Sequence, residues 1–297
     1  LRQVPAVVAG DKEARHGIIL AKSTPAKKYG IHTGEPLFQA LEKCPDLIVA
    51  PPDYGLYVEA SRHFVQVLRQ FSPVVQQYSI DEAFLSIELA FDYRKWGEAL
   101  VKKIGMWTGM PVSIGMAPTR TLAKAAVWFA KKWKGYNKVC IIENEEQREK
   151  ALKSLPIEEG WGIGWRGKSK CDYYGIKNGL DFTEKSESWV RKLFTITGVR
   201  TWRELKGQSS IESVLTGDKQ TICTSRSFDG MEQDKGKLEM YISNYAAHCA
   251  QKVRAQKSVC SMVTVFLQTN HFREDLPQHD AGLTVTLLTP ASSTNEI

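Results

Sequence analysis

An acidic pair interrupts an apolar segment at Tyr78-Ser79-Ile80-Asp81-Glu82-Ala83-Phe84. The strand-like pattern continues to Ile87, and its alternation would put Glu82 on one face and Asp81 on the other. A carboxylate inside a sheet is costly unless it is paired or binds a metal ion. Two such charges about 4 Å apart repel each other by roughly 4 kcal/mol at an effective dielectric near 20. The pair is therefore a candidate Mg²⁺ site; the alternative is a turn or strand end with solvated acids.

The composition is that of a globular chain with more than one domain. Its 297 residues exceed what one core usually serves, so about two to four domains are expected. No apolar run is long enough to span a membrane. The six cysteines are scattered without a Cys-x-x-Cys pair, which favours a reducing cytoplasm over zinc or disulfide frameworks. The formal net charge of +7 favours a polyanionic partner.

Residue patterns predict that helices and strands alternate around the acidic pair. Helices are expected at 25–29, 35–43, 56–71, 100–107, 119–133 and 241–256, and strands at 4–9, 17–21, 111–117, 139–142, 258–268 and 283–288. Residues 144 to about 216 show short helical patterns with little strand character, and residues 217–238 are polar and loop-like.

The acidic segment closely resembles the catalytic palm motif of the Y-family (translesion) DNA polymerases, most closely that of their UmuC-type branch. The resemblance extends from about Val4 to the last residue. It implies an α+β multidomain fold, the right hand of this polymerase family. The implied domains are fingers at 1–53, palm at 54–143, a helical thumb with a helix-hairpin-helix at 144–216, and a partial little finger at 217–297.

The resemblance implies an error-prone, template-directed DNA polymerase, a nucleotidyltransferase that copies past damaged bases in the SOS DNA-repair response. By the family pattern, Asp81 would bridge two Mg²⁺ ions, and Glu82 would hold the ion that activates the primer 3′-hydroxyl. Because strand alternation separates these neighbours, joint coordination needs a strand end or a β-bulge at this point.

Three lysines match family positions that contact the incoming deoxynucleoside triphosphate. Lys124 ends the segment Ser-Ile-Gly-Met-Ala-Pro-Thr-Arg-Thr-Leu-Ala-Lys at residues 113–124, which resembles the strand-loop-helix signature of the family. A helix N-terminus there would favour phosphate groups. Lys27 and Lys28 fall in the fingers-like region, where the chain departs from many members by having Thr24 in place of a tyrosine. The alternative for each lysine is a solvated surface position.

The segment Trp-Gly-Ile-Gly at residues 161–164 has the glycine pattern of a helix-hairpin-helix, and a basic run follows it. Glycines let backbone N–H groups approach a phosphate closely, and the positive charge adds sequence-independent, salt-sensitive binding. The alternative is a plain turn between helices. The candidate DNA-binding residues are Gly162, Gly164, Arg166, Lys168 and Lys170.

Aromatic residues are plentiful, and most fall at helical spacing, so they are expected in the core and are assigned no role. They include Trp128, Phe129, Trp133, Trp161 and Trp165. The histidines show no metal-ligand spacing.

Family members begin with a palm strand that carries the first metal carboxylate and an aromatic steric gate against ribonucleotides. Neither is found from Leu1 onward, and the little-finger pattern stops after Thr289-Pro290. We therefore expect a chain truncated at both ends and inactive as it stands, since Asp11 and Glu13 are poor substitutes for the missing acid. The implied partners are primer-template DNA and deoxynucleoside triphosphates, together with UmuD′-type subunits, a RecA filament and the sliding clamp.

Three hypotheses remain open from the sequence. An error-prone polymerase predicts that Asp81, Glu82 and Lys124 converge on one accessible cleft. A non-catalytic DNA-binding module, either a fragment or a decayed paralogue, predicts a basic groove with an incomplete metal site. A cytosolic scaffold predicts that Asp81 faces away from any cleft.

Overall fold

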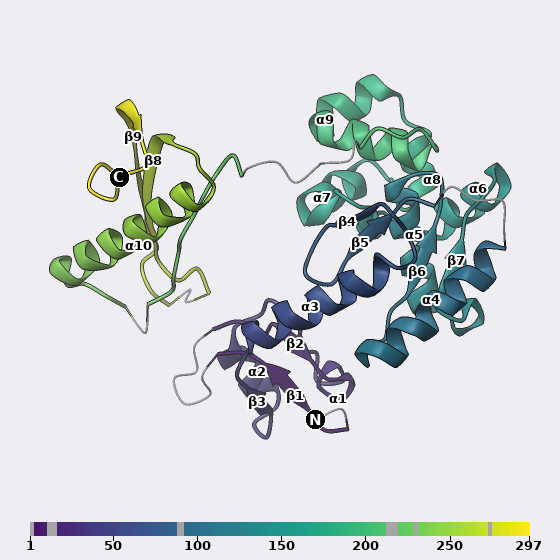
Figure 1. Ribbon diagram of the computed structural model, residues 1–297, viewed down its shortest axis with the longest axis horizontal. Helices are drawn as coiled ribbons and strands as arrows, with labels where there is room; N and C mark the ends of the chain where they lie inside the picture. The colour runs from purple at the N-terminus through teal and green to yellow at the C-terminus, as the bar shows by residue number, and fades with distance from the viewer. Residues whose placement is uncertain (1–2, 11–16, 88–91, 212–218, 229–230, 273–274) are drawn as a thin grey trace. The chain divides into compact units, whose positions relative to one another are not determined.

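The computed structural model describes residues 3–10, 17–87, 92–211, 219–228, 231–272 and 275–297. The chain divides into two compact units, one of Leu1–Asp53 with Thr216–Ile297, the other of Tyr54–Leu215. Helices and strands are mixed in both units (Figure 1), which confirms the expected α+β class. None of the helices in the described part of the chain is both long and apolar enough to cross a membrane.

The N-terminal segment folds around a three-stranded sheet in the order β2-β1-β3. Its elements are β1 (Ala6–Val8), β2 (Ala21–Lys22), α1 (Thr24–Lys27), α2 (Leu37–Lys43) and β3 (Ile48–Ala50). β1 pairs antiparallel with β2 and parallel with β3. The strand expected at 4–9 is confirmed, whereas the one expected at 17–21 begins only at Ala21. From the sequence no strand was expected at β3, which is held in the sheet by its parallel pairing with β1.

The unit that begins at Tyr54 first builds helices on two small sheets. Its elements up to residue 141 are α3 (Tyr54–Leu68), β4 (Val75–Gln77), β5 (Ala83–Leu85), α4 (Tyr93–Thr108), β6 (Ile114–Met116), α5 (Arg120–Lys132), η1 (Lys134–Tyr136) and β7 (Val139–Ile141). β4 and β5 form an antiparallel hairpin, whereas β6 and β7 run parallel. α3 and α4 share an apolar core that contains Phe64, Leu68, Leu100 and Ile104.

Two helices begin earlier than their apolar patterns predict, and an aspartate caps each of them. The Asp92 carboxylate accepts the N–H of Lys95 at 3.1 Å, which starts α4 and lowers the pKa of Asp92. Asp234 accepts the N–H of Lys237 at 3.1 Å and starts α10 (Lys235–Ala255). In both helices the capping aspartate marks the start, and the apolar period on which the prediction was based begins later along the helix.

α5 lies close against the strand β6. A Cβ atom on Gly115 of β6 would lie 2.1 Å from the Ala123 carbonyl oxygen and 2.5 Å from the Val127 nitrogen, so glycine is required there. Leu122 on the same helix is fully buried. This packing fixes the direction in which Lys124 leaves the helix.

The region from residue 145 to residue 205 is helical, as the short patterns predicted. Its elements are α6 (Glu145–Ser154), η2 (Ile157–Glu159), α7 (Gly164–Tyr173), α8 (Gly179–Thr183) and α9 (Glu187–Leu205). Their buried side chains join those of α5 and β7 in one core. α9 is kinked at Thr195, whose φ of 60° and ψ of −164° are not helical.

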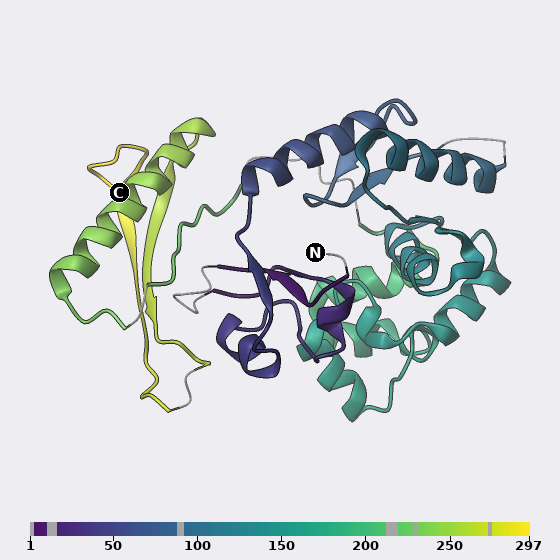
Figure 2. The ribbon, with the colours of Figure 1, turned by 90° about the horizontal axis from the view of Figure 1, so that it is seen from below.

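The C-terminal segment consists of α10 and a long antiparallel hairpin. β8 (Cys260–Gln268) pairs with β9 (Asp280–Ala291), with an irregular register between Cys260 and Met262. α10 crosses beside this hairpin in both ribbon views (Figure 1, Figure 2). The strands expected at 258–268 and 283–288 are confirmed, and β9 extends further in both directions.

Glu204, near the end of α9, is fully buried and joins three segments of the chain. Its Oε2 accepts the N–H of Thr121 at 2.9 Å, and its Oε1 accepts the N–H groups of Ser210 and Ile211, both at 3.0 Å. Its backbone oxygen accepts the hydroxyl of Thr119 at 2.8 Å. A buried carboxylate is tolerated only when hydrogen bonds replace its hydration, and these bonds do so.

We expect Glu204→Ala to destabilise the Tyr54–Leu215 unit by about 3 kcal/mol or more, because one buried and two partly buried N–H groups lose their acceptor. All eight tryptophans of the chain lie in this unit, so tryptophan fluorescence during urea unfolding reports on it alone. Glu149→Ala on the exposed side of α6 is the matched control and should shift the midpoint little. Equal midpoints for the two variants would contradict this role of Glu204.

Candidate functional site

Asp81 and Glu82 lie in the turn of the β4–β5 hairpin, directly before β5 begins at Ala83. The N–H groups of Tyr78 and Ser79 both donate to the carbonyl oxygen of Glu82, at 2.9 and 3.1 Å. Two residues thus oppose one, which is the pattern of a β-bulge. The expectation that the acids lie inside a strand is wrong, and the distortion needed for them to act together is present.

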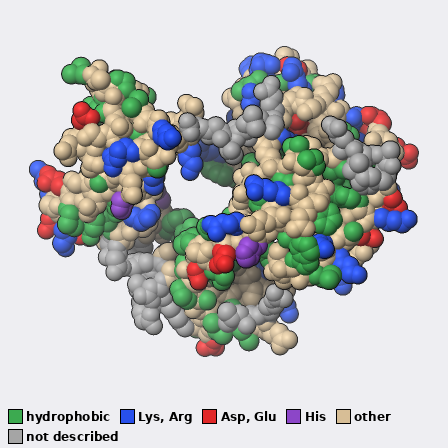
Figure 3. All heavy atoms as spheres, viewed as in Figure 1, with side chains coloured by type: hydrophobic (Ala, Val, Ile, Leu, Met, Phe, Trp, Pro, Cys, Tyr) green, Lys and Arg blue, Asp and Glu red, His purple; other side chains and the backbone are tan. Residues whose placement is uncertain are grey.

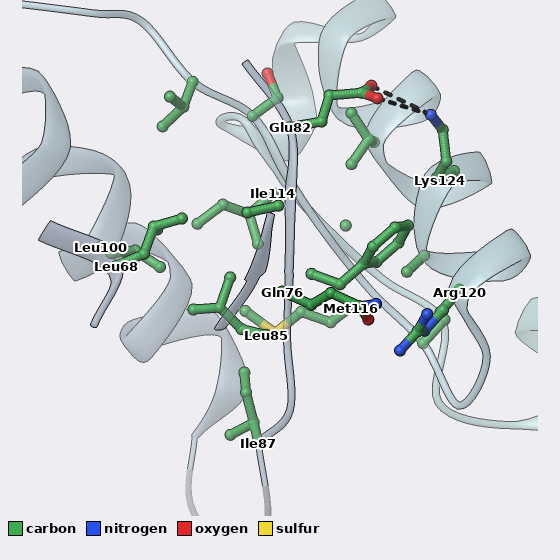
Figure 4. A pocket seen from close by; sticks show the side chains of 18 of the residues that line it. Leu68, Gln76, Glu82, Leu85, Ile87, Leu100, Ile114, Met116, Arg120 and Lys124 are labelled. Carbon is green, nitrogen blue, oxygen red and sulfur yellow. Dashed lines mark hydrogen bonds and ion pairs between the residues drawn. The ribbon is translucent and has the colours of Figure 1, made fainter. Parts of the chain in front are cut away.

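Both acids border one open cleft of ≈ 1340 Å³. Apolar side chains from several elements line much of it, including Leu68, Leu85, Leu100 and Ile114, while Arg120 and Lys124 of α5 bring positive charge (Figure 4). The volume exceeds the range of roughly 300–1,000 Å³ that is typical of small-ligand pockets. The scaffold hypothesis required Asp81 to face away from any cleft, and the structure contradicts it.

Lys124 forms an ion pair with Glu82 in this cleft (Figure 4). Its Nζ lies 3.0 Å from Oε2 and 3.2 Å from Oε1 of Glu82, and the two side chains are 28% and 40% exposed. Lys124 is therefore not a merely solvated helix lysine. The structure brings Asp81, Glu82 and Lys124 together, as the polymerase hypothesis predicted.

The cleft presents two carboxylates that could hold a divalent cation, those of Asp81 and Glu82. The hydroxyl of Ser79 donates to Asp81 Oδ1 at 2.7 Å, which orients that carboxylate. Among the residues that the structure describes, no three His, Cys, Asp or Glu side chains gather around one point. Two carboxylates on one cleft nevertheless fit Mg²⁺, which commonly takes one or two carboxylates and completes its shell with water and substrate phosphates. Asp11 and Glu13 lie outside the described residues.

The first turn of α5 is already occupied by protein acceptors. The Thr119 hydroxyl accepts the N–H of Leu122 at 3.3 Å, and the Glu204 carboxylate accepts that of Thr121. The expectation that this helix N-terminus favours a phosphate is wrong for these two N–H groups, because their hydrogen bonds are made and a carboxylate stands there. These two N–H groups therefore do not serve a phosphate, whereas the Lys124 side chain lines the cleft.

The predicted hairpin lies between η2 and α7, so it is preceded by a single 3₁₀ turn and not by a full helix. Gly162 has a φ of +88° and Gly164 a φ of +53°, and both are exposed. The first value lies in a region that other residues rarely adopt. The backbone at this turn is therefore shaped by glycine and open to a ligand.

The basic residues that follow the hairpin are partly engaged within the protein. Lys168 pairs with Asp172 at 3.1 Å, and this hydrogen bond raises the pKa of the lysine. Lys170 Nζ donates to the Leu193 carbonyl at 2.6 Å, next to the kink of α9, where the helical ladder is interrupted. Arg166 stacks beside the exposed ring of Trp165 at 5.1 Å. Figure 3 shows basic side chains interspersed with acidic ones on the visible face, without one dominant basic patch.

Lys27 and Lys28 belong to the other compact unit. Lys27 is the last residue of α1 and Lys28 caps that helix, and both side chains are exposed. The Ser23 hydroxyl caps the helix start by accepting the N–H of Ala26 at 3.3 Å.

Among the aromatic residues expected in the core, Trp165 is 75% exposed and Trp133 40% exposed, so for these two the expectation is wrong. Trp161 is half-buried and lies beside the acidic turn. Its ring lies 5.3 Å from that of Tyr78 and 5.6 Å from that of Phe84, and its Nε1 donates to the Tyr78 hydroxyl at 3.2 Å. The residue before the hairpin glycines thus contacts the turn that carries the acids. Helical spacing could not reveal this contact, because it joins residues 83 positions apart.

Comparison with known proteins places the chain in a family. Residues 1–127 match the model of the impB/mucB/samB family, and residues 219–297 match that of its C-terminal domain. Protein ImpB of Salmonella typhimurium is 33% identical over 100% of this chain and 71% of its own length. The chain belongs to the UmuC-type Y-family DNA polymerases. By family it is a DNA-directed DNA polymerase, and members of this family use divalent metal ions.

Further similar proteins support this family assignment. Protein UmuC of Salmonella typhimurium is 33% identical over 99% of this chain and 70% of its own length. Among solved structures, a Y-family DNA polymerase chimera of Dbh and Dpo4 covers 98% of this chain with a TM-score of 0.73 at 19% identity, and 83% of that structure is covered. This similarity confirms the Y-family fold.

We expect Gly162→Ala to destabilise the Tyr54–Leu215 unit by about 1–3 kcal/mol, because a φ of +88° strains any residue with a Cβ. The added Cβ would also lie 3.0 Å from the Thr201 hydroxyl oxygen. Gly135→Ala, where the space is open, serves as control and should leave the urea midpoint almost unchanged. A Gly162→Ala midpoint equal to that of the control would show that the turn does not require glycine.

Proposed function

We propose that this chain carries the catalytic centre of an error-prone translesion polymerase, which adds deoxynucleotides to a primer opposite damaged template bases. The observation that carries the proposal is the convergence of Asp81, Glu82 and Lys124 on one cleft. Membership of the UmuC-type family supplies the reaction class.

Asp81 and Glu82 are proposed to hold two Mg²⁺ ions together with water and the phosphates of the substrate. When bound, such a pair of ions stabilises the attacking and leaving oxygens of an in-line displacement. The protein's own contribution is to present both carboxylates from one short turn. The hydrogen bond from Ser79 holds Asp81 in place, and the bulge brings Glu82 to the same cleft.

Lys124 is proposed to bind the triphosphate of the incoming deoxynucleotide, since it is the lysine that stands beside the acids. Lys27 and Lys28 are proposed to contact phosphates of the incoming nucleotide, as the family pattern implies. The exposure of both side chains and the family pattern support this assignment.

The hairpin at residues 162–170 is proposed to contact the backbone of the primer-template DNA. Open backbone at Gly162 and Gly164, followed by Arg166, Lys168 and Lys170, suits phosphate groups of any sequence. The pairing of Lys168 with Asp172 means that DNA binding must exchange one ion pair for another.

We assign fingers to residues 1–53, palm to 54–143, thumb to 144–216 and little finger to 217–297. A UmuD′-type subunit, a RecA filament and the sliding clamp are proposed as partners on the family resemblance. The proposed place of action is the cytoplasm, where the DNA of a bacterial cell lies.

The experiment that tests the function is primer extension opposite an abasic template site by the protein as its gene encodes it. We expect Mg²⁺-dependent extension that Asp81→Ala and Glu82→Ala each reduce by about 100-fold or more, since charge stabilisation of this kind is large. Glu149→Ala should retain full activity. DNA binding without any extension would favour the non-catalytic DNA-binding module, and extension that survives Asp81→Ala would refute the catalytic assignment.

Binding of primer-template DNA should weaken steeply with salt. For the variant Lys168→Ala/Lys170→Ala, the slope of log K against log salt should shrink by about 0.7 to 0.9 for each phosphate group that the altered side chains no longer neutralise. Lys150→Ala/Lys153→Ala on α6 removes the same charge from exposed positions and should leave the slope almost unchanged. If the two double variants give the same slope, the hairpin does not belong to the binding surface.

A further inference from the structure

The ammonium group of Lys124 is held by two aromatic rings as well as by Glu82. Its Nζ lies 5.0 Å from the ring centroid of Tyr78 and 5.4 Å from that of Trp161. A cation at these distances is attracted by the face of an aromatic ring. We call Tyr78 and Trp161 the aromatic walls of this lysine.

The walls are themselves fixed in place. The indole N–H of Trp161 donates to the Tyr78 hydroxyl, and the two rings meet at 89°. The backbone oxygen of Trp161 accepts the hydroxyl of Thr201 at 2.9 Å, which fastens this residue to α9. The side chain of Trp161 thus links the helical region to the turn that carries the acids.

The ion pair and the cation–π contacts of Lys124 are each weak, so a competing ion can replace them. A partly exposed ion pair is a weak interaction, and a cation–π contact at a partly exposed site adds a contribution of similar size. Glu82 offers the lysine the same oxygens that a hard divalent cation would use. The lysine and the cation cannot both keep these oxygens at full strength.

We propose that Trp161 is a positioning residue that keeps Lys124 on Glu82 while the cleft is empty, so that the ammonium competes with a divalent cation. An incoming triphosphate offers Lys124 another anion and thereby releases Glu82 to the cation. Metal and nucleotide then enter the cleft as a cooperative pair. The inference rests on the proposed function, in which Glu82 is a metal ligand and Lys124 a phosphate ligand.

The test measures Mn²⁺ binding to the whole chain without DNA or nucleotide. The electron paramagnetic resonance signal of free Mn²⁺ reports how much of the ion stays unbound. Lys124→Gln should bind Mn²⁺ about 5-fold more tightly than the unaltered chain, because the competing ion pair is gone. Lys103→Gln is the matched control, since Lys103 also rests on a ring, that of Trp107 at 3.8 Å, but does not line the cleft. It should leave the affinity almost unchanged.

Trp161→Leu should also tighten Mn²⁺ binding, by about 3-fold, because Lys124 loses one wall. A merely structural role would weaken binding or leave it unchanged, so the sign identifies the mechanism. Trp161→Phe keeps a ring but removes the indole N–H, and should give a smaller increase. Trp107→Leu removes an indole that does not line the cleft, and it should leave Mn²⁺ affinity almost unchanged. The double variant Lys124→Gln/Trp161→Leu should bind no more tightly than Lys124→Gln, because both changes act through one ammonium.

The outcomes separate this inference from the proposed function. If Glu82→Gln weakens Mn²⁺ binding but Lys124→Gln does not tighten it, the competition is overturned and the metal site stands. If Glu82→Gln binds Mn²⁺ like the unaltered chain, both proposals are overturned. If the effects of Lys124→Gln and Trp161→Leu add, Trp161 does not act through Lys124, and its positioning role is overturned.

Discussion

The buried carboxylate of Glu204 is the constraint on which the site depends. It binds the first turn of α5 and the chain that leaves α9, so the helical region and the strand-containing region hold a fixed relation within one unit. A buried carboxylate is stable only if both of its oxygens accept hydrogen bonds. The packing of α5 against the end of α9 therefore has one specific geometry. The carboxylate also takes up the N–H group of Thr121, which would otherwise attract a phosphate. This N–H group therefore does not serve a phosphate, whereas the Lys124 side chain lines the cleft.

Two features then determine where charge stands in the cleft. The close approach of Gly115 to α5 fixes the direction of Lys124, and the bulge at Glu82 fixes the direction of the acids. The acids lie where an apolar sheet ends, so their carboxylates reach open space and are not buried in the sheet. This placement avoids the desolvation cost that a strand interior would impose, and it leaves the oxygens accessible to a cation.

The sequence predicted the parts of the fold whose signals are local. Most helices and strands followed from apolar periodicity, as at α5, where buried Leu122 and Phe129 mark one face. The early starts of α4 and α10 were missed because the prediction followed the apolar period and did not use the capping residues Asp92 and Asp234. β3 was missed, and its place in the sheet comes from pairing with β1, more than forty positions earlier in the chain. Such errors arise at elements that are stabilised by contacts with the rest of the fold and not by their own sequence pattern.

For the site, the sequence by itself determined which residues carry charge and which family motif they form: Asp81 and Glu82, Lys124, and the glycine hairpin. Only the tertiary structure decided how they meet. It placed the acids in a turn, paired Lys124 with Glu82, and brought Trp161 against Tyr78. These contacts join residues tens of positions apart, and no local periodicity encodes them. The packing of α5 and the buried bonds of Glu204 set those distances.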